Sequence, residues 1–204
     1  MPIRSLEELH ALYPEAMETA VKKECQHLLP QHCAYIEASP FVLIATAGPE
    51  GLDCSPRGDA APAVRIVDST TLELPDRRGN NRLDTLRNIV RDGRVGLLFL
   101  IPGVGVTLRV NGTAELHAER ELLASYAVGD KVPATVIRIT VSSVYTQCPK
   151  ALIRSELWNP ERFRDSADLP TVGQIMQTIT NGEFDGAAWD AGYPKLIQIG
   201  RAHV

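Results

Sequence analysis

The residues best suited to bind a charged ligand lie in a short polar turn at residues 75–82. An apolar strand precedes this turn, and apolar residues at helical spacing follow it, so we expect the turn to open a helix. The free N–H groups at a helix start and its positive dipole end attract anions, and arginines bind anions that have several oxygens. The turn is therefore interpreted as a phosphate-binding site, formed by Asp76, Arg77, Arg78, Asn80, Asn81 and Arg82.

The expected helix has recognisable start and stop signals. Asn81 suits the N-cap, Asp84 completes a capping-box-like pair three residues later, and Gly93 is placed to end the helix. The alternative is a surface helix whose arginines are simply solvated. Cations at a helix start oppose the dipole by roughly 0.3–1 kcal/mol each when no anion is bound. This cost favours a bound ligand.

Length and charge limit the classes of function. A length of 204 residues suits one main domain with helical additions. The formal net charge is -4. A negative net charge argues against broad, salt-dependent binding to nucleic acid. The amino terminus has no apolar stretch of signal-peptide length, and no segment is long enough to span a bilayer. We expect a cytoplasmic protein with no nucleic-acid or membrane partner.

The cysteines and histidines do not form a recognisable ligand set. The four cysteines are scattered without a C-x-x-C pair, and the five histidines show no zinc-ligand spacing with them. We therefore expect no metal site and no disulfide.

The remaining pattern predicts short strands between helical ends. Ser5 and Glu8 form a capping box, and Pro14 can open a second helix to about residue 28. Further helices are expected at residues 119–127 and 172–179, the second followed by a tail. Six or seven short strands around one substantial helix indicate an antiparallel barrel. The strands are expected at residues 41–46, 52–57, 63–67, 71–74, 95–101, 107–116 and 135–141.

A segment near residue 150 alternates cations with apolar residues. In an extended conformation, Lys150, Arg154 and Trp158 would share one face. An edge strand with solvated charges explains the same pattern equally well, and both interpretations stay open.

Four sequence blocks together resemble a known family. They are FVLIATAGPEGLDCSPRGD (41–59), LPDRRGNNRLDTLRNI (74–89), RVGLLFLIPGVGVTLRVNGTAEL (94–116) and CPKALIRSELW (148–158). In this order they resemble the pyridoxamine 5'-phosphate oxidase-like flavoproteins with the FMN-binding split-barrel fold. The combination looks more like a bacterial subgroup than like the vitamin enzyme itself.

The resemblance implies a mainly β (α+β) fold. This is an antiparallel six-stranded FMN-binding split β-barrel at residues 39–158, with helical extensions at 1–38 and 159–204. It also implies a homodimer with FMN between the subunits. Asn80, Asn81 and Arg82 occupy the position of the family's phosphate-binding motif. Arg57 corresponds to an arginine that reaches the phosphate or ribityl chain, and Thr107 to a polar residue beside the isoalloxazine.

The resemblance implies an FMN-dependent oxidoreductase. Its alternatives are a non-catalytic flavin-binding, storage or sensing module and a packed barrel without a cofactor. Only Arg201 and His203 echo the substrate motif of the vitamin enzyme, so we do not expect a pyridoxine vitamer as substrate. Relatives cover their open barrels by dimerising around the cofactor, so the segment from Lys150 to Trp158 is expected to complete the partner subunit's flavin site.

Overall fold

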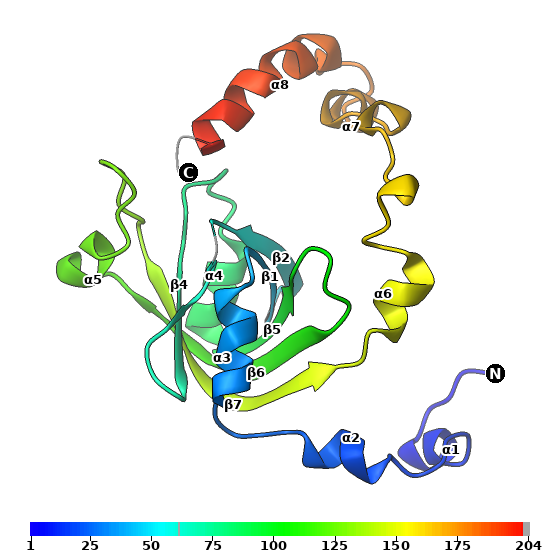
Figure 1. The fold of residues 1–204 in the computed structure, drawn as a ribbon. Helices are drawn as coiled ribbons and strands as arrows, with labels where there is room; N and C mark the ends of the chain where they lie inside the picture. Colours follow the sequence, from blue (N-terminus) through cyan, green and yellow to red (C-terminus); the bar gives the residue numbers. More distant parts are fainter. Residues whose placement is uncertain (61, 202–204) are drawn as a thin grey trace.

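The computed structural model describes residues 1–60 and 62–201, with side chains through Lys195. Its centre is one curved sheet of seven strands in the order β2-β1-β5-β6-β7-β4-β3, with every pairing antiparallel (Figure 1). The strands are β1 (Phe41–Gly48), β2 (Gly51–Gly58), β3 (Arg65–Ile66), β4 (Thr71–Pro75), β5 (Arg94–Leu100), β6 (Thr107–His117) and β7 (Val136–Gln147).

The two outermost strands, β2 and β3, do not pair with each other in the described part of the chain, so the barrel is open along this seam. The predicted antiparallel, mainly β (α+β) architecture is confirmed, with seven strands instead of six. The strand expected at 63–67 is shorter than predicted, because only Arg65 and Ile66 pair with β4.

The core lies inside the curve of the sheet. Alternate residues of β1 and β5 point inward, and Val42, Ile44 and Phe99 are almost completely buried. Burying such side chains contributes about 1.5–3 kcal/mol each, so this inner face dominates the stability of the barrel.

Helix α4 (Asp84–Arg91) packs against the hairpin of β1 and β2. Its buried Asn88 donates from Nδ2 to Thr46 Oγ1 at 3.1 Å. A Cβ on Gly48 would lie 2.1 Å from Asn88 Oδ1, so the hairpin can approach the helix this closely only with glycine at position 48. The contact fixes the helix relative to β1 and brings its amino end beside β2.

The amino-terminal helices differ from the prediction. Ser5 caps α1 (Leu6–His10) as expected, but the second helix is only α2 (Glu18–Lys22), and α3 (Pro30–Glu37) begins after it. Neither α1 nor α2 has a buried residue, and short helices without tertiary packing are marginal in water. The helix predicted from Pro14 to about residue 28 was therefore wrong.

The carboxyl-terminal half is more helical than predicted. The segment expected to be extended forms α6 (Lys150–Ser155), so the strand interpretation of Lys150, Arg154 and Trp158 was wrong. The predicted helices are present as α5 (Arg120–Ala124) and α7 (Val172–Ile179), and the tail forms α8 (Gly186–Arg201). Two short 3-10 helices, η1 (Pro160–Arg162) and η2 (Ser166–Asp168), lie between α6 and α7.

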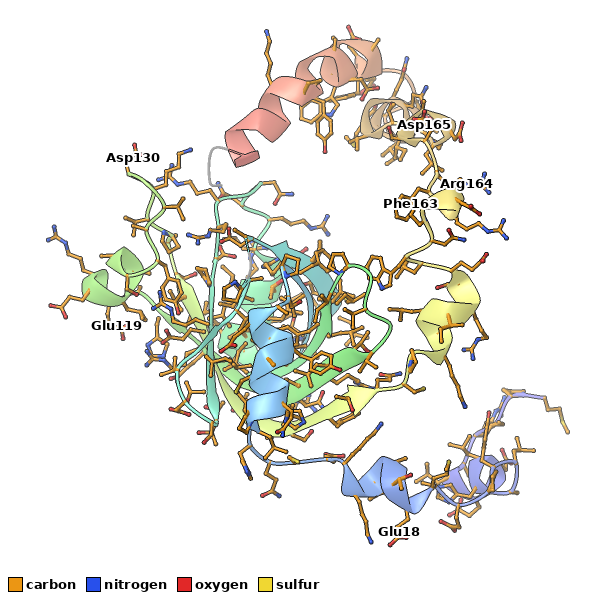
Figure 2. The ribbon with its side chains drawn as sticks, viewed as in Figure 1. Glu18, Glu119, Asp130, Phe163, Arg164 and Asp165 are labelled. Carbon is orange, nitrogen blue, oxygen red and sulfur yellow. The ribbon has the colours of Figure 1, made fainter. Side chains whose placement is uncertain are left out.

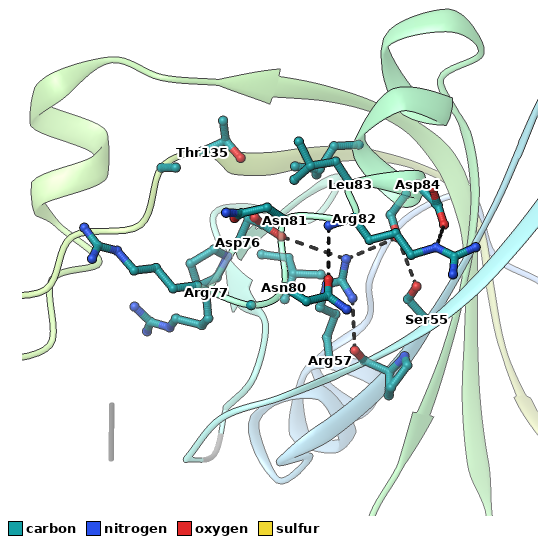
Figure 3. A pocket seen from close by; sticks show the side chains of 18 of the residues that line it. Ser55, Arg57, Asp76, Arg77, Asn80, Asn81, Arg82, Leu83, Asp84 and Thr135 are labelled. Atoms are coloured by element: carbon teal, nitrogen blue, oxygen red, sulfur yellow. Dashed lines mark hydrogen bonds and ion pairs between the residues drawn. The ribbon is translucent and has the colours of Figure 1, made fainter. Parts of the chain in front are cut away.

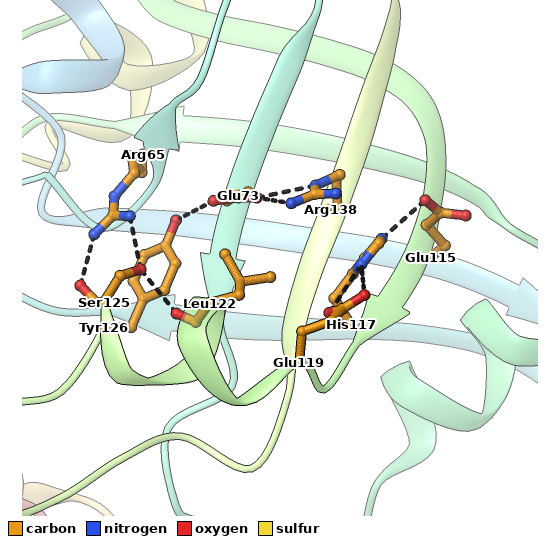
Figure 4. A network of polar contacts seen from close by, with 9 residues as sticks. All are labelled: Arg65, Glu73, Glu115, His117, Glu119, Leu122, Ser125, Tyr126 and Arg138. Carbon is orange, nitrogen blue, oxygen red and sulfur yellow. Dashed lines mark hydrogen bonds and ion pairs between the residues drawn. The ribbon is translucent and has the colours of Figure 1, made fainter.

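A buried acid ties β4 to β7 and to the segment after α5 (Figure 4). Glu73 is only 3% exposed, and its carboxylate accepts from Arg138 Nε at 2.9 Å and from Tyr126 Oη at 2.6 Å. Burial and the hydrogen bond to Glu73 raise the pKa of Tyr126, so the phenol stays protonated as a donor. Nearby on β6, the imidazole of His117 lies within hydrogen-bond distance of the carboxylates of Glu115 and Glu119. These carboxylates, Glu115 above all, raise the pKa of His117.

We predict that Arg138→Ala lowers the free energy of unfolding by roughly 3 kcal/mol, because it leaves the buried Glu73 carboxylate without its cation. Chemical denaturation followed by circular dichroism measures the change. Arg94→Ala is the matched control, because it removes an exposed arginine that pairs with Asp92 at 2.5 Å, and exposed ion pairs contribute little to stability. Equal midpoints for the two variants would contradict a structural role of the Glu73–Arg138 pair.

Candidate functional site

A cavity of about 740 Å³ opens where β2, the end of β4 and the start of α4 meet (Figure 3). Residues 134–135, before β7, close another side. The structure brings together here seven of the residues predicted to bind a ligand: Arg57, Asp76, Arg77, Arg78, Asn80, Asn81 and Arg82.

Strand β2 presents a polar row to the cavity and to α4. Asp53, Ser55 and Arg57 alternate along the strand, so their side chains leave the same face. Thr85, in the first turn of α4, donates to Asp53 Oδ2 at 2.5 Å, and Ser55 Oγ donates to the same oxygen at 2.9 Å. Arg57 Nη2 donates to Thr85 Oγ1 at 3.1 Å. The row therefore connects helix α4 to the guanidinium of Arg57.

Two buried polar atoms at this cavity have no hydrogen-bond partner among the described residues. They are Arg57 Nε and Thr135 Oγ1. Arg57 also donates from Nη1 to the carbonyl of Pro56 at 3.1 Å, so its Nε–H is the donor left open. Nearly all buried polar groups in folded proteins are paired, and an unpaired one costs about 1–3 kcal/mol. A ligand with acceptor and donor atoms would satisfy both.

Two of the other arginines of the cavity, Arg77 and Arg82, are already engaged. Arg77 donates from Nε to Asp59 Oδ2 at 2.8 Å and from Nη1 to the carbonyl of Tyr126 at 2.7 Å. The side chain of Arg82 is 79% exposed and pairs with Asp84. Arg77 thus holds the wall of the cavity in place, whereas Arg57 is the arginine with an unused buried donor.

The turn before α4 has an unusual backbone. Asn81 and Leu83 have φ values of 59° and 62°, in the left-handed region that is unfavourable for a leucine. Leu83 is the N-cap and provides no side-chain cap, so the predicted N-cap at Asn81, with its capping-box-like pair to Asp84, was wrong. Asn80 Oδ1 instead accepts from the backbone N–H of Arg82 at 3.1 Å. This bond forms an Asx-type turn that begins one residue before the predicted cap at Asn81.

The carboxyl end of α4 also differs from the prediction that Gly93 ends the helix. The C-cap is Asp92, and Gly93 is not in a left-handed conformation. A Cβ at position 93 would lie 2.9 Å from the carbonyl oxygen of Ala114, so glycine serves a close approach between backbones.

Asp76 places a carboxyl group near Arg57. Burial raises the pKa of Asp76, and the guanidinium of Arg57, 3.9 Å away, opposes this shift. The cavity is lined by four arginines and four aspartates: Arg57, Arg77, Arg78, Arg82, Asp53, Asp59, Asp76 and Asp84. This mixture suits a ligand that combines an anion with hydroxyl donors. No described lining residue is a histidine, cysteine or lysine.

The remaining predicted site residues do not line this cavity. Thr107 is buried at the start of β6, and Lys150 and Arg154 lie on the exposed helix α6. The indole of Trp158 donates to the carbonyl of Val104 at 3.0 Å.

Sequence reasoning did not predict six polar residues of the cavity as site residues: Asp53, Ser55, Asp59, Asp84, Thr85 and Thr135. The alternation of Asp53, Ser55 and Arg57 along β2 was a signal that could have found two of them. Thr135 gave no such signal, because only the fold brings the segment before β7 to the turn.

Other kinds of site find no support in the described residues. The searched part of the chain contains no group of three or more potential metal ligands. All four cysteines are free thiols, with Cys54 and Cys148 exposed. No described helix has both the length and the hydropathy needed to cross a bilayer.

Several solved structures are similar to this chain at 20% sequence identity or less. HupZ from Group A Streptococcus is 20% identical, with a TM-score of 0.48, over 59% of this chain and 95% of that one. A protein named after pyridoxamine 5'-phosphate oxidase, from Lactobacillus delbrueckii, is 19% identical over 59% and 95% of the two chains, also with a TM-score of 0.48. A similarly named protein from Listeria innocua is 17% identical over 57% and 94%, with a TM-score of 0.44.

No curated protein sequence matches the chain. The family model for pyridoxamine 5'-phosphate oxidase, however, matches residues 28–148, which is 121 of the 204 residues. The matched region contains the whole sheet and the cavity. Because this match spans more than half of the sequence, the chain belongs to the pyridoxamine 5'-phosphate oxidase family.

Proposed function

We propose that the cavity binds FMN and that the protein is an FMN-dependent oxidoreductase. One observation carries the proposal: Arg57 Nε and Thr135 Oγ1 are buried without partners at a cavity of about 740 Å³. A volume of this size is within the usual range for cofactor sites. Membership of the pyridoxamine 5'-phosphate oxidase family supports a flavin as the ligand.

The residues present fit a flavin phosphate and its ribityl chain. Arg57 would donate to a phosphate oxygen, and Asn80 and Arg82 would add donors from the turn that opens α4. The carboxyl of Asp76 would accept from ribityl hydroxyls. Arg77 would orient this wall indirectly, through its bonds to Asp59 and the carbonyl of Tyr126. FMN, when bound, supplies electron transfer between a donor and an acceptor.

The proposed FMN-binding domain comprises residues 39–158, and residues 1–38 and 159–204 are its extensions. We also propose a homodimer in which α6 reaches the flavin site of the partner subunit. Lys150 and Arg154 support this role because they are exposed, four residues apart on one helix, and away from their own cavity. The bond from Trp158 to the carbonyl of Val104 would hold the segment after α6 in position.

We predict that the purified protein takes up FMN and shows flavin absorption. Under anaerobic conditions, NADH or NADPH should bleach this absorption, and oxygen or another acceptor should restore it. Bound flavin that is inert to both steps would favour a storage or sensing module instead. Protein that stays colourless after incubation with FMN would reject a flavin site altogether.

Arg57→Ala should weaken FMN binding about ten- to a hundredfold, because a charge-assisted contact to phosphate is worth roughly 1.5–3 kcal/mol. Arg82→Ala should have a smaller effect, since Arg82 is exposed and already paired. The matched control is Arg91→Ala at the end of α4, because Arg91 pairs with Glu50 and does not line the cavity. Fluorescence titration with FMN measures all three, and equal affinities would overturn the phosphate assignment.

Lys150→Ala should lower FMN affinity about tenfold if α6 completes the partner's site, because it removes one cation near the cofactor. Arg94→Ala removes an exposed cation at the start of β5 that does not line the cavity, and it should leave the affinity unchanged. If the Lys150 variant keeps wild-type affinity, α6 does not contribute to the site.

A further inference from the structure

The guanidinium of Arg57 is held at two of its three nitrogens. Nη1 donates to the carbonyl of Pro56 at 3.1 Å, and Nη2 donates to Thr85 Oγ1 at 3.1 Å. Because a guanidinium is a rigid plane with its N–H groups in a fixed fork, these two bonds also fix the direction of the third group, Nε–H. That group is the buried donor left open to a ligand. Its direction therefore depends on where Pro56 and Thr85 hold the other two nitrogens.

Of these two anchors, only Thr85 acts through its side chain. It is the second residue of α4 and is 2% exposed. Its hydroxyl has one hydrogen, whereas a guanidinium only donates, so Thr85 accepts from Arg57 only when its own hydrogen points elsewhere. The group that takes the hydrogen of Thr85 thus decides whether Nη2 of Arg57 is held.

The carboxylate of Asp53 takes this hydrogen. Thr85 Oγ1 lies 2.5 Å from Asp53 Oδ2 and 3.2 Å from Ser55 Oγ. The carboxylate is the acceptor because charge-assisted O–H···O⁻ bonds are strong and have oxygen–oxygen distances of about 2.5–2.7 Å. Ser55 donates to both oxygens of Asp53, at 3.1 and 2.9 Å, so the carboxylate is itself held. A hydroxyl relay therefore runs in one direction, from Arg57 through Thr85 to Asp53.

The relay spans a gap that the two strand residues do not close by themselves. Asp53 and Arg57 lie on the same face of β2, four residues and thus roughly 13 Å apart along the strand. Thr85 reaches this gap from α4, beside which Arg57 lies (Figure 3). The carboxyl of Asp76 is farther from Arg57, with Oδ1 3.9 Å from Nη2. Thr85 is therefore the side chain that links Arg57 to Asp53.

We propose that Asp53 and Thr85 are positioning residues, whose hydroxyl relay holds Arg57 with its Nε–H directed at an anionic ligand. The inference rests on the proposed function for the identity of this ligand, because the phosphate of FMN is the anion assigned to Arg57. It gives Asp53 a role opposite to the one expected from charge alone. A carboxylate beside a phosphate site repels the ligand, whereas this carboxylate strengthens binding by orienting the arginine.

Asp53→Asn separates these two roles by the sign of its effect. If charge dominates, loss of the carboxylate strengthens FMN binding. The relay instead predicts an affinity about three- to tenfold lower, because an amide is a weaker acceptor and also presents an NH2 group to Thr85. Fluorescence titration with FMN measures the change, and a variant that binds as tightly as the wild type, or more tightly, would overturn the relay.

Asp165→Asn is the matched control for this substitution. Asp165 lies outside the barrel, before η2, and does not line the cavity (Figure 2). The same loss of charge at this position should leave the FMN affinity unchanged.

Two substitutions of Thr85 separate its hydroxyl from its packing. Thr85→Val keeps a similar volume without the hydroxyl and should weaken FMN binding about three- to tenfold, whereas Thr85→Ser should retain most of the affinity. In an Arg57→Ala background, Thr85→Val should have almost no further effect, because the relay acts only through Arg57. Circular dichroism verifies that each variant is folded. A serine variant as weak as the valine variant, or additive effects of Thr85→Val and Arg57→Ala, would contradict the relay.

Nuclear magnetic resonance of the ligand-free protein tests the relay without FMN. The Nε–H resonance of Arg57, identified by its loss in Arg57→Ala, should be sharp in the wild type and broadened in Asp53→Asn and Thr85→Val. A resonance that is equally sharp in all three, or broad in the wild type, overturns the inference even if FMN binds. If the wild type binds no FMN but the resonance depends on Asp53 and Thr85, the relay stands and the proposed function fails.

Discussion

The contact between α4 and the hairpin of β1 and β2 determines the geometry of the candidate site. A Cβ on Gly48 would clash with the side chain of Asn88 where it lies, and Asn88 bonds from that position to Thr46. This contact fixes the position of the helix along the strand. Because the first turn of α4 is then held beside β2, Thr85 can bridge Asp53 and Arg57. The cavity is thus a consequence of how one helix packs on one hairpin.

The polar groups around the cavity have two roles: some hold the cavity wall in place, and others are open to a ligand. Asp59 and the carbonyl of Tyr126 hold Arg77 in the wall, and Tyr126 is in turn held by the buried Glu73. Arg57, by contrast, is oriented through Nη1 and Nη2 and leaves its Nε donor unused. Orienting groups in advance lowers the cost of ordering them when a ligand binds. The acidic residues serve as much to position the arginines as to neutralise them.

The sequence patterns predicted the sheet well, because alternation and continuous apolar runs report directly on burial. They also located the turn at residues 75–82 at the cavity. The same patterns failed where tertiary contacts decide local structure, as for the helix predicted from Pro14 and the extended segment at Lys150. The left-handed Leu83 could not have been anticipated from propensity, since leucine disfavours that conformation. Thr135 enters the site only because β4 and β7 are neighbours in the sheet.

The open seam of the barrel gives access to the cavity, but it also leaves two strands with unpaired edges. Exposed strand edges can recruit strands from other molecules and start aggregation. On β2, Pro56 removes one backbone donor from the edge, and Arg57 adds a charge next to it. On the other side, β3 has only two residues, too few to guide an incoming strand. The chain can therefore keep its barrel open to a ligand while both margins of the opening resist the addition of a foreign strand.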